Sequence, residues 1–237
     1  SSRTFHKMLQ LTSQHLSPTL LNTYNTSTKV DSTLKSRCFS SQNILSTYKL
    51  EPVMDRITSY RPISILPVVS KLMERILYDQ MYNYLKKQNV LSEHQFGFRQ
   101  FHSTTTTLLD CTNEWYINMD RGLYNIVVLL DLKKAFDTVN HEILLRKFER
   151  YGFGNKALDL LSNYLTNRTQ RCQLNGMLSD QRGITCGIPQ GSILGPLLFI
   201  IYINDLPNCL KHTTPRMFAD DTSLTALTID SENVYYW

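Results

Sequence analysis

Two apolar segments that end in aspartate constrain this chain more than any other feature. The first, residues 125–131, reads Asn-Ile-Val-Val-Leu-Leu-Asp, and the second, residues 217–221, reads Met-Phe-Ala-Asp-Asp. A continuous apolar run of strand length is typical of a strand covered on both faces. Residues 223–227 again favour a strand, so Asp220 and Asp221 are expected at the tip of a hairpin.

Carboxylates placed this way point to a cation. Adjacent acids on a short turn repel each other, and their burial is costly unless a positive charge compensates. Mg²⁺ accepts hard oxygen ligands and completes its coordination with water and substrate phosphate. Two such ions can activate a hydroxyl and stabilise the leaving oxygen in phosphoryl transfer. An isolated Asp-Asp pair is more often a solvated turn, so this interpretation depends on Asp131 and on the rest of the chain.

The composition is that of a folded, mildly basic protein. The 237 residues include 25 Lys and Arg against 20 Asp and Glu, a formal net charge of +5. That balance allows a nucleic-acid partner without requiring one. The five cysteines are widely spaced and form no pattern that a zinc site needs, so reduced thiols in an intracellular protein are expected. No apolar run is long enough to cross a membrane, and no membrane partner is expected.

Residues 1–50 differ from the rest of the chain. They are rich in Ser and Thr, hold a single acidic residue and show no sustained periodicity. We expect a poorly ordered leader, or sequence that does not belong to the folded domain. Residues 51–237 are expected to form that domain.

The periodicity beyond residue 60 predicts an α+β layout, with one sheet backed by helices. The predicted elements are an extended segment at 63–66, helices at 69–85, 103–119, 140–151 and 155–165, a strand at 168–174 before an Asn175-Gly176 hairpin turn, a loop at 187–191, an apolar helix from its N-cap Ser192 to about Asp205, and the acidic hairpin.

Five motifs in this order resemble the fingers and palm of the reverse transcriptases of non-LTR (LINE-type) retrotransposons. The resemblance covers about residues 60–227. Its motifs are Tyr60-Arg-Pro-Ile-Ser-Ile-Leu-Pro67, Phe96-Gly-Phe-Arg99 with Ser103-Thr104, Leu130-Asp-Leu-Lys-Lys-Ala-Phe-Asp137, Gly187-Ile-Pro-Gln-Gly-Ser192 through Asp205, and Phe218-Ala-Asp-Asp221.

The resemblance implies a two-metal polymerase site. Asp131 and Asp220 would bridge two Mg²⁺ ions, which Mn²⁺ could replace, and Asp221 would complete the cluster. The backbone carbonyl of Leu132 is a further expected ligand. With an RNA template and a DNA primer, the primer 3′-hydroxyl would attack the α-phosphate of a dNTP and release pyrophosphate.

The same resemblance implies how substrates are bound. Phe136 would lie under the nucleotide sugar and exclude a 2′-hydroxyl, although ordinary core packing is the alternative. Gln190 and Gly191 would face the nucleotide or the template, and the loop could also be a plain helix connection. Arg61 would grip the triphosphate with its forked donors. Arg99 would line the nucleic-acid path, or else form a structural salt bridge.

These expectations assign residues 51–122 to the fingers and 123–237 to the palm, with the thumb absent. A triphosphate-binding lysine expected in the preceding strand is not evident in Glu51–Ser59. Two other functions stay open: an inactive truncated remnant that at most binds nucleic acid, and an RNA-directed RNA polymerase, which Phe136 disfavours. An intracellular ribonucleoprotein of the nucleus or cytoplasm is expected. The oligomeric state is not predicted.

Overall fold

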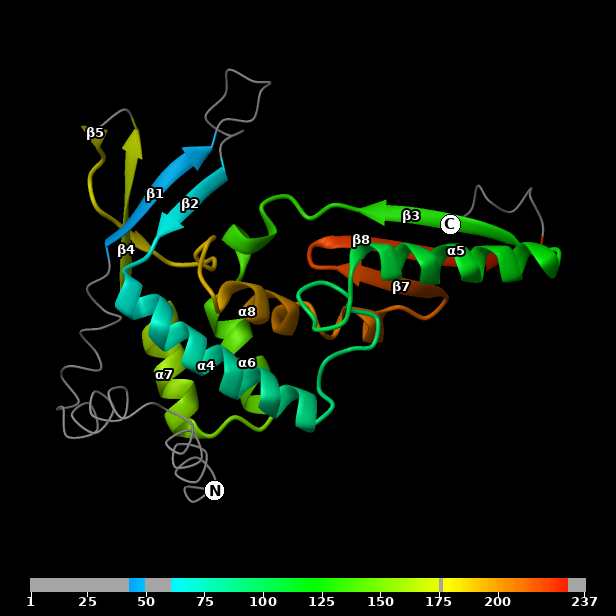
Figure 1. Cartoon of the computed structure of the whole chain (residues 1–237), viewed down its shortest axis with the longest axis horizontal. Helices are drawn as coiled ribbons and strands as arrows, with labels where there is room; N and C mark the ends of the chain where they lie inside the picture. Colours follow the sequence, from blue (N-terminus) through cyan, green and yellow to red (C-terminus); the bar gives the residue numbers. More distant parts are fainter. Residues whose placement is uncertain (1–42, 50–60, 175–176, 230–237) are drawn as a thin grey trace.

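The computed structural model describes residues 43–49, 61–174 and 177–229 of the chain. Two β-sheets stand apart from each other and a group of helices joins them (Figure 1). In chain order the elements are β1 (Asn43–Lys49), β2 (Arg61–Ile65), α4 (Val68–Lys87), α5 (Thr104–Asp120), β3 (Tyr124–Leu130), the 3₁₀ helix η2 (Ala135–Thr138), α6 (His141–Arg150), α7 (Asn155–Leu165), β4 (Arg168–Leu174), β5 (Met177–Leu178), β6 (Arg182–Ile184), α8 (Gly195–Tyr202), the 3₁₀ helix η3 (Leu206–Cys209), β7 (Thr213–Phe218) and β8 (Asp221–Thr228).

The three-stranded sheet is antiparallel, with the order β3-β8-β7. The α+β class, the strand after residue 124 and the acidic hairpin are therefore confirmed. The expected burial of the first strand is wrong, because Val128, Leu129 and Leu130 are 48%, 78% and 40% exposed. Among the described strands β3 is an edge strand that pairs with β8 alone, so an apolar run does not by itself guarantee cover on both faces.

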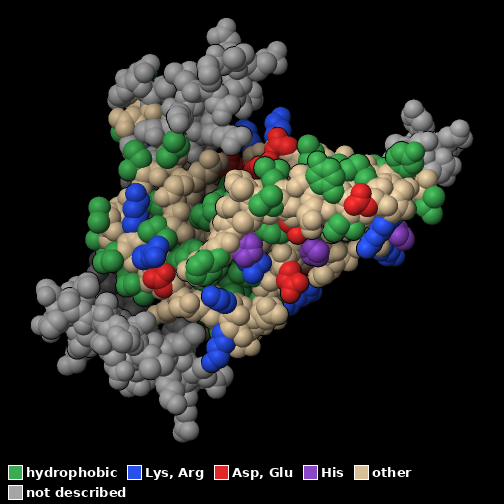
Figure 2. Space-filling view, turned by 45° about the vertical axis from the view of Figure 1, so that its right-hand side comes forward, with side chains coloured by type: hydrophobic (Ala, Val, Ile, Leu, Met, Phe, Trp, Pro, Cys, Tyr) green, Lys and Arg blue, Asp and Glu red, His purple; other side chains and the backbone are tan. Residues whose placement is uncertain are grey.

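Helix α5 packs against one face of this sheet. Trp115 donates to the hydroxyl of Thr225 on β8, and the buried Arg216 on β7 pairs with Asp110 and Glu114 of the helix. Burial lowers the pKa of Arg216, but its hydrogen bonds to the two carboxylates outweigh that effect and raise it. The outer surface of the arm formed by α5 and the sheet carries many apolar side chains (Figure 2).

The second sheet was not expected, since the sequence predicted one sheet. Its strand order is β2-β1-β4-β5, with β6 on the other part of β4, and β1 pairs with β4 in parallel. A boundary at residue 122 does not separate the two sheets, because β4 pairs with β1 and carries β5 and β6, while α5 contacts β3 and β7. Strand β1 falls within residues 1–50; the rest of that stretch, Glu51–Ser59 and the Asn175-Gly176 turn lie outside the described residues.

Helix α8 is the centre of the core. Five consecutive side chains, Leu197 to Ile201, are at most 1% exposed, as expected for a helix that is apolar on every side. The helix is shorter than predicted, because it begins at Gly195 and its N-cap is Leu194 rather than Ser192. Ser192 still contributes, since its hydroxyl accepts the Gly195 N–H at 2.9 Å.

The remaining predicted helices are confirmed as α4, α5, α6 and α7. Asn140 caps α6 by accepting the Ile143 N–H, and Gly152 follows its C-cap with φ +83°, a conformation that glycine adopts without strain. The apolar stripe of α4 is buried only in its second half. Val69 and Leu72 are 63% and 52% exposed, whereas Leu85 is fully buried. No helix in the described part of the chain is long and apolar enough to cross a membrane.

A buried carboxylate ties α4 to the start of α8. Glu74 is 0% exposed and accepts the Ile193 N–H at 2.7 Å and the Leu194 N–H at 3.4 Å. The Tyr164 hydroxyl donates to the same carboxylate at 3.1 Å. Burial, and then the charge of Glu74, raise the pKa of that hydroxyl, so it keeps its proton and donates it. These contacts fix the segment that follows the Pro-Gln-Gly loop.

We predict that Glu74→Ala lowers the free energy of unfolding by about 3 kcal/mol, because it removes the buried carboxylate that accepts the Ile193 and Leu194 N–H groups. Urea unfolding measures this loss. Glu142→Ala is the control, since Glu142 is exposed and, among the described residues, forms an ion pair with Arg146 alone, one helical turn away; its effect should stay within about 0.5 kcal/mol. Equal effects of the two substitutions would contradict the anchoring role of Glu74.

Candidate active site

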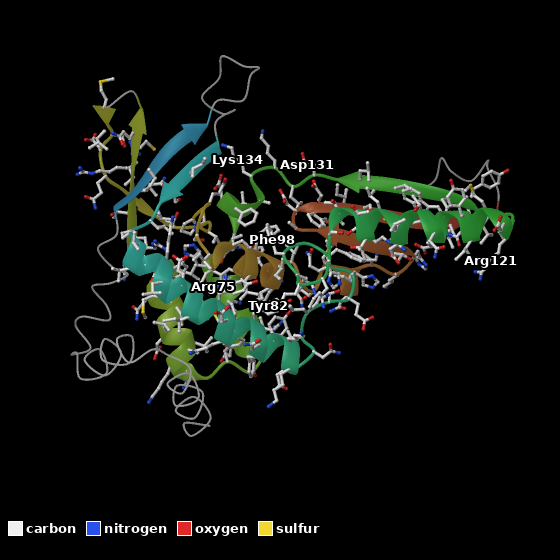
Figure 3. The ribbon with its side chains drawn as sticks, in the orientation of Figure 1. Arg75, Tyr82, Phe98, Arg121, Asp131 and Lys134 are labelled. Carbon is white, nitrogen blue, oxygen red and sulfur yellow. The ribbon has the colours of Figure 1, made fainter. Side chains whose placement is uncertain are left out.

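Strand register brings the three aspartates to one end of the three-stranded sheet. Leu130, the last residue of β3, pairs with Thr222, so the next residues outward are Asp131 on one strand and Asp221 on the other. Phe218 pairs with Asp221, which leaves Ala219 and Asp220 as the turn between β7 and β8. Asp131 and Asp221 are exposed and Asp220 is half-buried. Figure 3 shows Asp131 where the chain leaves β3.

The donor chemistry of this end fits a divalent cation, since carboxylate oxygens are the ligands that Mg²⁺ prefers. The side chains do not converge, however. In residues 43–49, 61–174 and 177–229 no three Asp, Glu, His or Cys side chains lie close enough together to hold a metal ion. Like charges repel, and a cation would be needed to draw these carboxylates together. Leu132, expected to supply a carbonyl, follows Asp131 in the segment that leads to η2.

The acidic turn rests on a distant segment of the chain. Residues 94–97 lie alongside β7, where the Met217 N–H donates to the His94 carbonyl and the Phe96 N–H to the Met217 carbonyl, both at 2.8 Å. A Cβ on Gly97 would lie 2.2 Å from the backbone nitrogen of Ala219, so only glycine fits beneath the turn. The Phe96-Gly-Phe-Arg99 motif thus supports the hairpin directly.

Phe136 packs between two other rings. Its ring stacks on that of Phe199 with centroids 4.6 Å apart and meets the edge of Phe98 at 6.3 Å. The half-buried side chain therefore covers the core below it. This is the packing role that the sequence left open, and the exclusion of a ribose 2′-hydroxyl stays a prediction.

Gln190 and Gly191 lie where the loop after β6 touches β2. The Gln190 carbonyl accepts the Ser64 N–H at 2.8 Å, and its side-chain amide donates to Asp137 at 3.0 Å. Gly191 has φ +96°, and a Cβ there would lie 3.2 Å from the Ser64 carbonyl. The close approach that this glycine permits is therefore made to β2.

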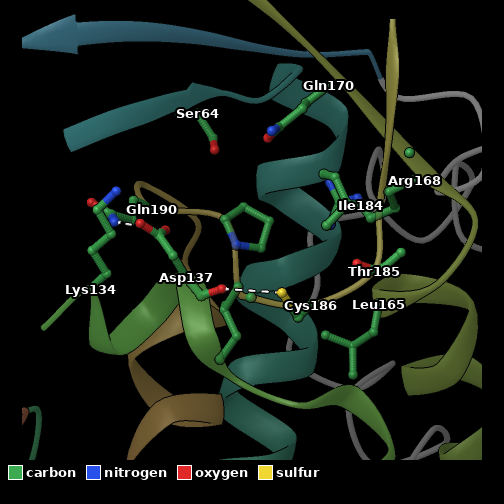
Figure 4. A pocket seen from close by; sticks show the side chains of 14 residues that line it. Ser64, Lys134, Asp137, Leu165, Arg168, Gln170, Ile184, Thr185, Cys186 and Gln190 are labelled. Atoms are coloured by element: carbon green, nitrogen blue, oxygen red, sulfur yellow. Dashed lines mark hydrogen bonds between the residues drawn. The ribbon is translucent and has the colours of Figure 1, made fainter. Parts of the chain in front are cut away.

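A cavity of about 330 Å³ opens beside this loop. Figure 4 shows Lys134, Asp137 and Gln190 together on one wall, with Arg168 and Ile184 on the opposite side. None of the three aspartates at the sheet end lines it. The cavity therefore presents a polar wall of cation, carboxylate and amide next to the loop, separate from the acidic turn.

The two arginines differ in what the structure describes. Arg61 opens β2, but its side chain lies outside the described residues. Arg99 donates to the carbonyls of Ser92 at 2.7 Å and Gln95 at 3.1 Å, and it forms no ion pair with any described residue. It therefore closes the 92–99 loop on itself, and its contact with nucleic acid stays a prediction.

Sequence reasoning missed four residues that support the site. Glu74 anchors the start of α8, Asp137 holds the amide of Gln190, and His141 bonds to the Gly187 carbonyl at 2.7 Å. Gln95 is 1% exposed and contacts the acidic turn. Asp137 could have been identified from the sequence, because it is the last residue of the Leu130–Asp137 motif. The other three act across long stretches of chain and leave no local signal.

Comparison with known proteins identifies the family. Residues 50–233 match the family described as "Reverse transcriptase (RNA-dependent DNA polymerase)", which is more than half of the chain. The chain therefore belongs to the reverse transcriptase family, and the resemblance noted in the sequence is confirmed.

Relatives in Drosophila melanogaster place it among the non-LTR retrotransposon members. It is 36% identical over 173 residues to the probable RNA-directed DNA polymerase from transposon BS, an alignment that covers 70% of this chain and 19% of the relative. The RNA-directed DNA polymerase from mobile element jockey is 30% identical over 195 residues, with coverages of 79% and 21%. The chain thus spans about a fifth of the length of these relatives.

Solved structures support the fold. A Candida albicans telomerase in complex with a TWJ fragment of telomeric RNA aligns with a TM-score of 0.54 and 13% identity, over 87% of this chain and 40% of that one. An apo telomerase from Candida tropicalis aligns at 0.53 and 13%, covering 83% and 45%. At this identity the likeness shows a shared polymerase fold.

We predict that Gly97→Ala lowers the free energy of unfolding by about 3 kcal/mol, because a methyl group cannot fit 2.2 Å from the Ala219 nitrogen without moving the hairpin. Urea unfolding tests it. Gly183→Ala is the matched control, since nothing lies within 4 Å of a Cβ there; it should change stability by less than about 0.5 kcal/mol. A neutral Gly97→Ala would show that the turn does not rest on this segment.

Proposed function

We propose that this chain is the polymerase core of an RNA-directed DNA polymerase, which adds dNTPs to a primer 3′-hydroxyl on an RNA template. The observation that carries the proposal is the register of the three-stranded sheet, which places Asp131 at the same end as Asp221 and the Ala219-Asp220 turn in a member of the reverse transcriptase family. The mildly basic charge of the chain suits a polyanionic partner.

Asp131, Asp220 and Asp221, with the Leu132 carbonyl, would hold two Mg²⁺ ions. When bound, these ions supply a lowered pKa for the attacking hydroxyl and charge stabilisation for the leaving oxygen. In the proposed reaction a bond forms between the primer O3′ and the α-phosphorus. The bond from that phosphorus to the bridging oxygen breaks, pyrophosphate leaves with the electron pair, and the proton of the 3′-hydroxyl is released to water.

Other side chains would place the nucleotide. Gln190 offers a side-chain amide, and its bond to Asp137 fixes which way that amide points. Arg61 would bind the triphosphate and Arg99 the nucleic-acid path. Phe136, between Phe98 and Phe199, would stand below the sugar. We assign the fingers to about residues 51–122 and the palm to about 123–237, with β4 to β6 joining the sheet of the fingers.

A non-catalytic role in nucleic-acid binding is the second candidate. It is favoured by one observation: in the described part of the chain the three carboxylates share a sheet end without converging on a metal position. The two candidates differ in whether removal of the carboxylates abolishes nucleotide addition.

We predict that Asp220→Ala/Asp221→Ala reduces dTTP incorporation on poly(rA)/oligo(dT) by about 1,000-fold or more, because it removes the ligands of the proposed ions. Primer extension with Mg²⁺ or Mn²⁺ measures it. The control Asp120→Ala removes an exposed carboxylate at the far end of α5 and should leave incorporation unchanged. Equal incorporation by the wild type and the double variant would leave only the binding function.

We predict that Phe136→Val lowers discrimination between dTTP and UTP by about tenfold or more, because a smaller side chain leaves room for the 2′-hydroxyl. The measured quantity is the ratio of kcat/KM for the two nucleotides. Phe199→Leu, which changes the stacked partner beneath Phe136, should leave that ratio within about twofold. An unchanged ratio in Phe136→Val would defeat the sugar-sensing role and reopen an RNA-polymerase interpretation.

A further inference from the structure

We propose that Gln95 is a positioning residue that holds the Ala219-Asp220 turn in the conformation needed for metal binding by Asp220. The proposal rests on the polymerase function proposed above. It concerns a buried amide that acts through the backbone of the turn, and that makes no contact with the reacting atoms itself.

The side-chain oxygen of Gln95 contacts the acidic turn and the segment that supports it. Its Oε1 accepts the N–H of Ala219 at 3.1 Å and the N–H of Gly97 at 2.7 Å, and the residue is 1% exposed. Two backbone donors aimed at one atom identify that atom as the amide oxygen, because the amide nitrogen cannot accept. The side chain therefore joins the two backbones at the place where they approach most closely.

The backbone conformation of the turn needs a stabilising contact. Ala219 has φ +58°, in the left-handed region that a residue with a Cβ seldom adopts. The two-residue loop leaves Ala219 as the residue that sets the direction of Asp220. If Ala219 relaxes to negative φ, Asp220 must turn away. A displacement on the order of 1 Å at a catalytic group can cost about a hundredfold in rate.

The two polar atoms of the Gln95 amide differ in how they are satisfied. The oxygen accepts two backbone N–H groups, which an apolar side chain would leave without this acceptor. The Nε2 is buried and has no hydrogen-bond partner among the described residues, a cost that opposes those two bonds. The amide is therefore explained by its oxygen, which joins the Ala219 turn to the segment at residues 94–97.

The experiment compares wild type with Gln95→Met, which keeps the shape and removes the acceptor, and adds Ala219→Gly to each. Three quantities are measured: hydrogen exchange of the Ala219 amide by NMR, Mn²⁺ binding to the free protein by electron paramagnetic resonance, and primer extension. We expect Gln95→Met to speed that exchange and to weaken Mn²⁺ binding by about tenfold each, and to lower kcat with less than about a twofold change in the KM for dNTP.

Glycine at position 219 adopts the left-handed turn without strain. In the Gln95→Met background, Ala219→Gly should therefore restore a large part of Mn²⁺ binding and of kcat. The control is Asn118→Ala, a buried residue of α5 that bonds to Asn125 near the opposite end of the sheet. It should lower stability while leaving Mn²⁺ binding and Ala219 exchange unchanged.

The outcomes separate this proposal from the one on which it rests. Unchanged Ala219 exchange or Mn²⁺ binding in Gln95→Met overturns the positioning role, and so does a failure of Ala219→Gly to restore binding. Absence of Mn²⁺ binding in wild type defeats the metal role of Asp220 and this proposal with it. A wild type that binds Mn²⁺ but extends no primer contradicts the polymerase function alone, and the exchange and binding data still decide the role of Gln95.

Discussion

The antiparallel ladder between β3 and β8 is the constraint on which the rest of the site depends. Seven residue pairs, from Tyr124 with Thr228 to Leu130 with Thr222, fix the register of the two strands. Because side chains alternate along a strand, a slip of one residue would turn every side chain of β3 to the other face. The register also places Asp131 at the end of the sheet where β8 begins with Asp221 and where the turn carries Asp220.

The sheet places the three aspartates at one end, and segments far away in the sequence support the acidic turn and the start of α8. Gln95 and Gly97 hold the turn from a segment more than 120 residues earlier, and Glu74 reaches a similar distance to fix the start of α8. All three contacts are to backbone groups, so they constrain where the chain goes whatever side chains the loops carry. The candidate metal end and the Gln190 loop are thus each fastened to the earlier half of the chain.

Local patterns predicted most of the elements, since these depend on residues close together in sequence. Helix α7 begins and ends where expected, and Asn140 and Gly152 mark the start and end of α6 through capping contacts that act within one turn. The three aspartates were also apparent in the sequence, because Asp131 and Asp220 directly follow apolar runs; their metal binding stays a prediction. The register of β3 with β8 could be determined only from the structure.

What the sequence did not predict depends on contacts across the fold. The parallel pairing of β1 with β4 joins residues over 120 positions apart, and the sequence of neither strand indicates which strand it pairs with. The run 125–130 was expected to be covered on both faces, but burial is set by neighbours in space, and β3 has one paired strand among those described. The sequence left open a structural salt bridge for Arg99. The Arg99 guanidinium instead donates to two backbone carbonyls of its own loop, and a pattern of charged residues does not predict such contacts.

The central claim is that Asp131, Asp220 and Asp221 bind metal as one site. Anomalous diffraction tests it most directly, on crystals of this chain with an RNA–DNA primer-template, MnCl₂ and a non-hydrolysable dNTP. The account predicts a manganese peak between the carboxylates of Asp131 and Asp220, with the nucleotide phosphates against it. An ordered duplex and nucleotide with no manganese at that end of the sheet would contradict it.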